Sequence, residues 1–143
     1  MIEHLVTSIG DTGNVVVYNQ SFESGVVDSL ATTFPEHSEK LQNIRGRLVD
    51  LLVPFRNFHY YHPGQMGSAS MKKVLPALTG KGYDGMDIGK GDDASAAFYK
   101  IALGDISEEE KDKTKKDLER YCALDTEGMV WILDSLKVQI YRK

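Results

Sequence analysis

The period of the apolar positions changes early in the chain. Residues 2–9 predict a helix that ends at Gly10, and residues 11–13 then predict a turn. Residues 14–18 follow as Asn-Val-Val-Val-Tyr, an unbroken run without the alternation of a half-exposed strand. Such a run predicts a strand that is buried on both faces and therefore lies parallel to its neighbours in the centre of a sheet.

Helical spacing follows directly after this strand. Phe22, Val26, Val27 and Leu30 fall on one stripe of the expected helix, which Pro35 ends. A further helical pattern starts near residue 41. Residues 48–53 fit either the end of that helix or a second short strand, and the pattern does not separate the two.

The next segments alternate between short helices and loops. Residues 58–62 are expected to be extended up to Pro63, because a residue before proline avoids the helical region. A short helix is expected over residues 71–78, although Pro76 should end or distort it. Residues 79–91 contain five glycines and predict a loop.

The last third of the chain is expected to be helical. One helix starts at Asp92 or Asp93 and runs to about residue 103. Ser107 and Glu110 then form a capping box that opens a long helical stretch to about residue 140, which Gly128 should divide in two. The apolar stripe of this stretch comprises Leu118, Cys122, Met129, Ile132 and Leu136.

This order of elements predicts an α/β fold, rich in helix, with a small parallel sheet built on the strand near 14–18 and a candidate strand at 48–53. We expect residues 1–143 to form a single domain, because this length suits one core. One buried strand cannot form a sheet alone, and the chain supplies few neighbours for it. We therefore expect that sequence upstream of residue 1 belongs to the same fold.

Composition narrows the class of protein. The chain is 41% hydrophobic and 27% charged, which is ordinary for a globular protein. No apolar run approaches the roughly 18 residues of a membrane helix, and no signal peptide is visible, so we expect a cytoplasmic protein without a membrane partner. The single cysteine, Cys122, excludes an internal disulfide and a cysteine-rich zinc site.

Charge is unevenly distributed along the chain. Residues 1–39 carry six acidic residues and no Lys or Arg, whereas residues 40–81 carry seven basic residues against Asp50 alone. The patchiness has two interpretations: an ordinary solvated surface, or a basic strip that holds a phosphate backbone beside an acidic metal site.

Two acidic residues stand out in their context. Asp125 falls on the apolar stripe of the last helix, four residues after Tyr121 on the same face, where an ionised carboxylate is costly unless it is paired, capping or bound to metal. The alternative is that Asp125 caps a new helix starting at Thr126. Glu23 follows the buried strand at its carboxyl end, where open α/β sheets place their sites. Its alternative is a favourable first-turn acid in a helix capped by Asn19 or Ser21.

Together these segments resemble the DEDD-type 3′–5′ exonucleases of the ribonuclease H-like superfamily, in their tyrosine subtype. Asn19-x2-Phe22-Glu23 resembles the second motif of that family, with Glu where Asp is usual, and Tyr121-x3-Asp125 resembles the third. Segments spread over residues 15–126 also resemble an uncharacterised bacterial family that is often fused to RecB-like nuclease domains. The first motif, Asp-x-Glu on a strand, has no counterpart here, so the resemblance implies a C-terminal part of such a domain, truncated before that motif.

The resemblance implies a metal-dependent 3′–5′ exonuclease that hydrolyses phosphodiester bonds with two metal ions. Glu23 and Asp125 would bind Mg²⁺ or Mn²⁺, and Tyr121 would orient the attacking water, so these three side chains are expected to meet in space. Asn19 and Phe22, together with Lys72 and Lys73 of the basic stretch, would contact the 3′ end of DNA or RNA.

Because two of four carboxylates are missing, this chain is expected to bind metal weakly or not at all and to be nearly inactive. An open sheet edge favours self-association as a homo-oligomer. The alternative function is a non-catalytic module that binds nucleic acid or docks a RecB-like nuclease domain in cis, which the basic stretch and the Glu at position 23 favour.

Overall fold

The computed structural model describes residues 2–89 and 91–141. In chain order its elements are α1 (Ile2–Ile9), β1 (Val15–Val17), α2 (Gln20–Thr33), the 3₁₀ turn η1 (Pro35–His37), α3 (Ser38–Gly46), β2 (Leu48–Asp50), α4 (Val53–Arg56), the 3₁₀ turn η2 (Pro63–Gln65), α5 (Met71–Thr79), α6 (Gly91–Leu103) and α7 (Glu108–Tyr141). The chain divides into two compact units. Unit 1 comprises Met1–Tyr61 and Gly67–Met71, and unit 2 comprises His62–Met66 and Lys72–Lys143.

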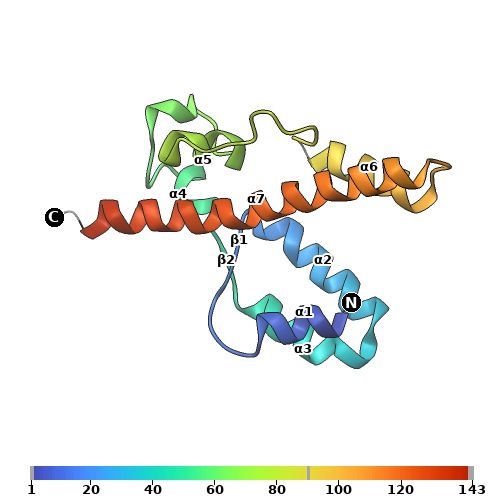
Figure 1. Ribbon diagram of the computed structural model, residues 1–143. Coiled ribbons are helices and arrows are strands. Elements are labelled where there is room, and N and C mark those ends of the chain that lie inside the picture. The colour runs from blue at the N-terminus through green and yellow to red at the C-terminus, as the bar shows by residue number, and fades with distance from the viewer. Residues whose placement is uncertain (1, 90, 142–143) are drawn as a thin grey trace. The chain divides into compact units, whose positions relative to one another are not determined.

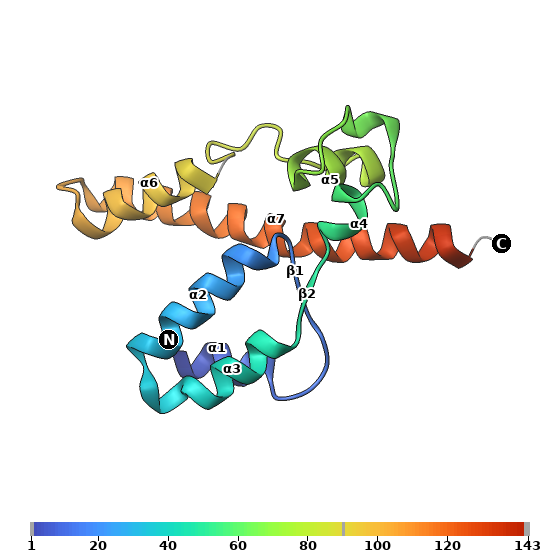
Figure 2. The same ribbon diagram turned by 180° about the vertical axis from the view of Figure 1, so that it is seen from behind.

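Unit 1 is built on a parallel pair of strands. β1 pairs with β2 in the register Val15↔Leu48 to Val17↔Asp50, and the crossover between them is formed by α2, η1 and α3 (Figures 1 and 2). The strand predicted near residues 14–18 is confirmed, and residues 48–50 form the strand that was one of two alternatives. The prediction of a central strand is wrong: within the described residues the sheet has two strands, and Val15 and Val16 are only half-buried.

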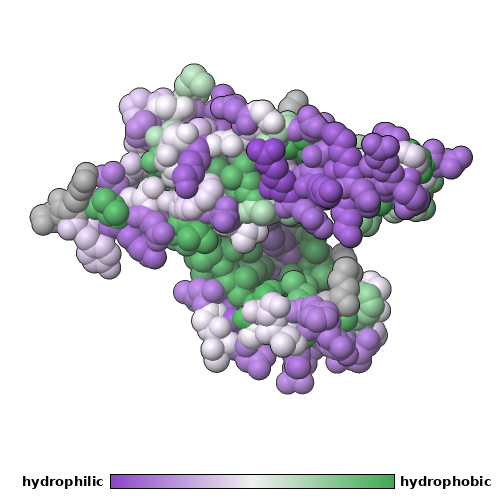
Figure 3. Space-filling view, viewed as in Figure 1, coloured by the Kyte–Doolittle hydropathy of each residue, from purple (hydrophilic) through white to green (hydrophobic). Residues whose placement is uncertain are grey.

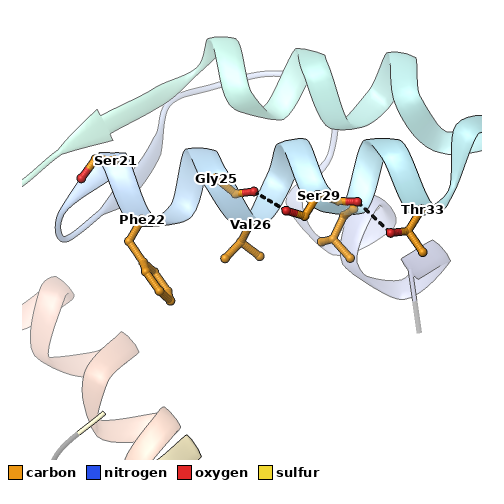
Figure 4. A pocket seen from close by; sticks show the side chains of 7 residues that line it. Ser21, Phe22, Gly25, Val26, Ser29 and Thr33 are labelled. Atoms are coloured by element: carbon orange, nitrogen blue, oxygen red, sulfur yellow. Dashed lines mark hydrogen bonds between the residues drawn. The ribbon is translucent and has the colours of Figure 1, made fainter. Parts of the chain in front are cut away.

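The core of unit 1 lies between α1, α2 and α3. It is formed by Ile2, Val6, Val27, Ala31, Leu41 and Ile44, with Ile9, Val15, Leu30 and Phe34 packed against it. The predicted stripe of α2 is partly wrong, because Phe22 and Val26 are 68% and 43% exposed while Val27 is buried. Figure 4 shows Phe22 and Val26 projecting from the same side of α2. The buried face of α2 is rotated by about one residue from the predicted one.

Arg47 fixes the turn that connects α1 to β1. Its guanidinium donates hydrogen bonds to the backbone oxygens of Gly10 (2.5 Å), Thr12 (2.8 Å) and Gly13 (2.7 Å), and to Asn43 Oδ1 (2.9 Å). Gly10 and Gly13 have φ values of 68° and 82°, a region that glycine reaches without steric cost. This arginine of the basic stretch therefore has a structural role.

Residues 58–62, where the chain passes from unit 1 to unit 2, differ from their predicted structure. Residues 58–62 are not extended throughout, because Phe58 has a positive φ of 54° and residues 57–60 form turns and bends. Extended geometry is reached at His62, whose Nδ1 accepts a hydrogen bond from Gly64 N–H at 3.1 Å. The His62 N–H in turn donates to Gln65 Oε1 at 2.8 Å, so His62 caps η2.

Unit 2 is dominated by α7, which begins as the sequence predicts. Ser107 Oγ accepts a hydrogen bond from Glu110 N–H at 3.2 Å, the bond of a capping box. The predicted division at Gly128 is wrong, since α7 continues unbroken for 34 residues. For the same reason Asp125 does not cap a new helix. α5 likewise continues past Pro76 to Thr79.

The buried face of α7 differs in part from the predicted stripe. Tyr121, Gly128 and Ile132 are buried, whereas Cys122 is exposed. The described chain is therefore mostly helical with one small parallel sheet, the α/β organisation expected at the coarse level. Within residues 2–89 and 91–141, no helix has both the length and the apolar character needed to span a membrane.

Candidate functional site: two acidic clusters

The first cluster lies where β1 passes into α2. Asn19 adopts a left-handed conformation, with φ 84° and ψ 67°, so the chain turns sharply before α2. The Asn19 backbone oxygen accepts from Phe22 N–H at 2.9 Å, while its side-chain oxygen accepts from Ser21 Oγ at 2.9 Å. No side-chain capping bond from Asn19 to the helix is formed. The Asn19-x2-Phe22-Glu23 segment thus lies at a strand-to-helix junction, as its sequence pattern implied.

Asp50 connects the carboxyl ends of the two strands. Its Oδ1 accepts hydrogen bonds from the backbone N–H groups of Asn19 and Leu52, both at 2.9 Å. The first bond joins the end of β2 to the turn after β1, across 31 residues of sequence. Asp50 therefore holds the junction in shape and keeps a carboxylate at the site where open parallel sheets bind ligands.

Glu23 lies beside Asp50 on the inner face of α2, one turn before the buried Val27. Its Oε2 is buried and has no hydrogen-bond partner within the described residues. Burial raises the pKa of the Glu23 carboxyl, its own backbone N–H lowers it, and the nearby charge of Asp50 raises it further. The Glu23 carboxyl is therefore partly buried next to a second carboxylate, and a cation or a proton would stabilise it there.

A polar hollow of about 570 Å³ opens beside this corner, on the α2 side. Its lining includes Asp50, Arg45 and Arg56. Arg45 is exposed and forms an ion pair with Asp28 at 2.9 Å, and Arg56 is also exposed.

Tyr18 lies next to Asp50. Burial, and then the charge of Asp50, raises the pKa of Tyr18, whose hydroxyl donates to Ala69 O at 2.5 Å. Tyr18 is thus a neutral donor that, within unit 1, fastens residues 67–71 to the end of β1.

The second cluster lies on α7 in unit 2. Asp125 Oδ1 accepts a hydrogen bond from the Tyr83 hydroxyl at 2.5 Å, and Tyr121 is hydrogen-bonded to the same carboxylate. The rings of Tyr83 and Tyr121 lie 6.0 Å apart at an interplanar angle of 44°. Burial, followed by the charge and hydrogen bond of Asp125, raises the pKa of Tyr121 to about 12. Two phenol groups therefore stabilise the Asp125 carboxylate on the half-buried face of α7.

Tyr83 is a member of this cluster that sequence reasoning missed. It comes from the glycine-rich segment 79–91, whose only aromatic residue it is, and this was the available signal. A tyrosine in a glycine-rich loop can pack its ring against a neighbouring element while its hydroxyl finds a hydrogen-bond partner. Here Tyr83 is fastened to the Asp125 carboxylate, 42 residues away.

The basic stretch of residues 40–81 is largely committed to contacts inside each unit. Besides Arg45 and Arg47, Lys72 Nζ lies 5.6 Å from the centre of the Tyr83 ring, and Lys81 Nζ lies 3.6 Å from that of Trp131. Lys73 on α5 is exposed. Several of the basic side chains that the sequence suggested for a continuous phosphate-binding strip are therefore engaged in other contacts.

The predicted catalytic residues are divided between the two units. Glu23 belongs to unit 1, whereas Tyr121 and Asp125 belong to unit 2, so their meeting in space stays a prediction. Within the described residues, no group of three or more His, Cys, Asp or Glu side chains is arranged to hold a metal ion. Each cluster by itself offers at most a partial set of ligands.

Comparison with known proteins connects the chain to bacterial proteins of unknown function. Residues 1–70 match the family described as Domain of unknown function (DUF2779). The chain is 29% identical over 134 residues to the "Uncharacterized protein MG366 homolog" of Mycoplasma pneumoniae, and 28% identical over 130 residues to "Uncharacterized protein MG366" of Mycoplasma genitalium.

These alignments cover 85% and 82% of this chain, but the chain spans only about a fifth of the length of either relative. No solved structure gives a significant match. The expected likeness to an uncharacterised bacterial family is thereby supported for the first half of the chain, at the level of a domain of unknown function.

Proposed function

We propose that this chain is part of a metal-dependent, exonuclease-like domain that acts on the 3′ end of DNA or RNA. The observation that carries the proposal is the buried, unpartnered Oε2 of Glu23 next to Asp50, at the carboxyl ends of two parallel strands. A carboxylate oxygen in that position is costly unless a cation or a donor compensates it. The Asn19-x2-Phe22-Glu23 and Tyr121-x3-Asp125 segments resemble exonuclease motifs, and this resemblance supports the proposed reaction class.

The residues present suit a hard divalent cation. Mg²⁺ and Mn²⁺ prefer oxygen ligands, and Glu23 and Asp50 provide carboxylate oxygens within one neighbourhood. Asp50 still has an oxygen, Oδ2, that the junction's hydrogen bonds do not use. A bound metal would supply charge neutralisation for a phosphodiester group and polarise a water molecule. Asp50 is a carboxylate near enough to Glu23 for its charge to raise the Glu23 pKa.

In this proposal Tyr121 acts as a hydrogen-bond donor. Because its pKa is raised to about 12, the phenol stays protonated at neutral pH and cannot serve as a general base there. Asp125 holds the Tyr121 hydroxyl and, through Tyr83, the glycine-rich segment. Tyr121 would therefore orient a water molecule or a phosphate oxygen, and Asp125 would fix its direction.

Substrate contacts are assigned to exposed groups around the two clusters. Phe22 is 68% exposed in the first turn of α2, where a ring can stack on a nucleic-acid base. A shallow hollow of about 540 Å³ runs from it along the outer face of α2 (Figure 4). Asn19 holds the turn before it. The exposed Lys73 would provide positive charge for phosphates, and Lys72, which lies over the Tyr83 ring, would add to it. The chain alone would have at most a half-site, so weak metal binding in the millimolar range and little turnover are expected.

The decisive test is metal binding to the chain itself. Mn²⁺ binding can be measured by electron paramagnetic resonance. We expect the wild type to bind Mn²⁺ weakly, and the variants Glu23→Gln and Asp50→Asn to lose this binding. Both changes remove charge, and Asn at position 50 keeps the Oδ1 that accepts the two backbone bonds. Asp134→Asn, an exposed residue paired with Lys137 on α7, is the matched control and should leave binding unchanged. Binding that survives Glu23→Gln would exclude the proposed site.

Catalysis needs a second assay, on a chain extended at its N-terminus. Labelled single-stranded DNA or RNA should be shortened from the 3′ end in Mg²⁺ or Mn²⁺, and Asp125→Asn should abolish this shortening. Salt-sensitive binding without digestion would instead support the non-catalytic module, which binds nucleic acid or docks a RecB-like nuclease domain. The exposed Lys73 and Arg56 are the observations that keep this alternative open.

A further inference from the structure

Two aromatic side chains of unit 1 lie side by side at its surface. Phe58 and Tyr61 are 67% and 44% exposed, and their ring centroids are 5.8 Å apart at an interplanar angle of 42°. Apolar residues also form a patch over the part of unit 1 that holds α1 and α2 (Figure 3), but the hollow there is lined mostly by aliphatic side chains and by no residue of segment 51–61. The exposed ring pair is therefore a separate surface feature with its own chemistry.

The segment that carries the two rings is anchored from the inside. Phe55 is 1% exposed and meets the Tyr60 ring edge to face, with centroids 6.0 Å apart and an interplanar angle of 86°. The Tyr60 N–H donates to Pro54 O at 3.1 Å, and the Tyr61 hydroxyl accepts from Gly67 N–H at 3.2 Å. The outward rings are thus held in place before any ligand arrives, which lowers the ordering entropy that binding costs.

Phe58 has a backbone conformation that is costly for a bulky residue. Its φ of 54° lies in the left-handed region, where the Cβ of an L-residue approaches a backbone carbonyl oxygen. Glycine or asparagine would adopt this conformation with less strain. Strained positions of this kind are concentrated at functional sites and ligand clamps. A phenylalanine here destabilises the turn and displays a ring to solvent, so the ring itself is the feature that needs a function.

Charge indicates which partner suits these rings. Within unit 1, residues 51–61 and 67–71 contain Arg56 and no acidic residue. Arg56 is exposed, forms no ion pair among the described residues, and lines the polar hollow of about 570 Å³. A base has a planar face that stacks on aromatic rings, and its phosphate is an anion that a guanidinium binds. Rings beside an available arginine therefore fit an unpaired nucleotide better than an aliphatic protein surface.

We propose that Arg56, Phe58 and Tyr61 form a base-stacking platform for single-stranded nucleic acid. Phe58 and Tyr61 stack on unpaired bases, and Arg56 contacts a backbone phosphate. A duplex is excluded from this binding mode, because its base faces are already stacked on one another. The inference rests on the proposed function only for the class of partner, a nucleic acid, and does not depend on metal binding.

The test is fluorescence anisotropy with the intact chain in a buffer that contains EDTA. The probes are labelled oligothymidylate and oligouridylate of about ten nucleotides, a length within the usual site size, which distinguish DNA from RNA as the ligand. We expect single strands to bind more tightly than a duplex of the same length, with an affinity that falls as salt rises. Arg56→Gln should weaken binding and reduce this salt dependence, since one phosphate contact is lost.

Variants at Phe58 separate stacking from folding. Phe58→Asn removes the ring but tolerates the left-handed conformation, so it should weaken binding about tenfold without lowering the urea midpoint of unfolding. Phe58→Trp keeps a stacking ring and should bind at least as tightly as the wild type. Phe98→Ala is the matched control, because Phe98 is 60% exposed on α6 and forms a similar exposed pair with Tyr99, with centroids 6.4 Å apart. It should leave the affinity unchanged, since the first turn of α6 is acidic.

An affinity that is unchanged in Phe58→Asn, or that falls equally in Phe98→Ala, would overturn the proposal. A chain that binds neither oligonucleotide would also overturn it, and would leave a protein surface as the partner of the two rings. The EDTA keeps this result apart from the proposed metal site. Oligonucleotide binding without Mn²⁺ binding would refute the proposed function alone, and Mn²⁺ binding without oligonucleotide binding would refute the platform alone.

Discussion

The Tyr83 hydroxyl donates a 2.5 Å hydrogen bond to Asp125 Oδ1, across 42 residues of sequence. This contact fastens the glycine-rich segment 79–91 to the middle of α7. It also means that Asp125 has a structural role in the chain as it stands, in addition to the role proposed for it with Tyr121. The two roles are separable, because Tyr83 and Tyr121 approach the same carboxylate from different elements.

Replacing Tyr83 with Phe should destabilise unit 2 by about 1.5–3 kcal/mol, the range for a hydrogen bond to a charged group. The ring contact with Tyr121 would remain, so the loss should come from the hydroxyl alone. Urea unfolding measures the change, and faster proteolysis within residues 79–89 should accompany it. Tyr99→Phe is the control, since Tyr99 is 63% exposed on α6 and should lose little. Equal stability of the two variants would show that the Tyr83–Asp125 bond contributes nothing.

Arg47 and Arg45 offer a matched pair for testing which arginines of the basic stretch are structural. Arg47→Lys should cost about 2 kcal/mol, because an ammonium group cannot reproduce the fork that serves three backbone oxygens. Arg45→Lys should cost less than about 1 kcal/mol, because Arg45 forms an exposed ion pair with Asp28 that a lysine can also form. Thermal unfolding of both variants at one salt concentration decides the order. The reverse order would mean that the turn at residues 10–13 is not held by Arg47.

Gly25 is a glycine that the helix does not need. A Cβ at this position of α2 would have no atom within 4 Å, so Gly25→Ala should stabilise the chain by about 0.5–1 kcal/mol. At Gly13, by contrast, φ is +82°, and Gly13→Ala should destabilise by about 1 kcal/mol although the space is equally open. Denaturant midpoints of the two variants should shift in opposite directions. If both midpoints shifted in the same direction, the backbone geometry described for one of these two positions would be wrong.

Local chemistry accounts for what the sequence predicted correctly. The end of α1 at Gly10, the capping bond at Ser107 and the strand at Val15–Val17 each depend on residues within a few positions. The continuity of α7 through Gly128 was missed, because a helix interior tolerates glycine at about 1 kcal/mol when packing compensates. The positive φ of Phe58 has no signature in its residue type.

The candidate site was predictable only in part. Asn19, Phe22 and Glu23 lie at a strand-to-helix junction as expected, because that placement follows from the order of elements. The proximity of Asp50 to Glu23, and of Tyr83 to Asp125, arises from the crossover and from loop closure over tens of residues. No periodicity encodes such contacts, so they become visible only in three dimensions.

Glu23 should give the chain an unusual dependence of stability on pH. Burial raises the pKa of its carboxyl above the ordinary value of 4.5, and the adjacent Asp50 adds to that increase. The folded state therefore binds more protons than the unfolded state in the window that begins near pH 4.5, and the contribution of Glu23 to stability declines as pH rises through its folded pKa. Glu23→Gln mimics the protonated group and should remove this decline, so the variant should gain stability over the wild type at pH 7 but not at pH 4. Urea unfolding at both pH values in EDTA measures the difference, with Asp134→Asn as the exposed control. A variant that is no more stable than the wild type at pH 7, relative to pH 4, would show that the Glu23 carboxyl is well solvated and would remove the main support for a cation site beside Asp50.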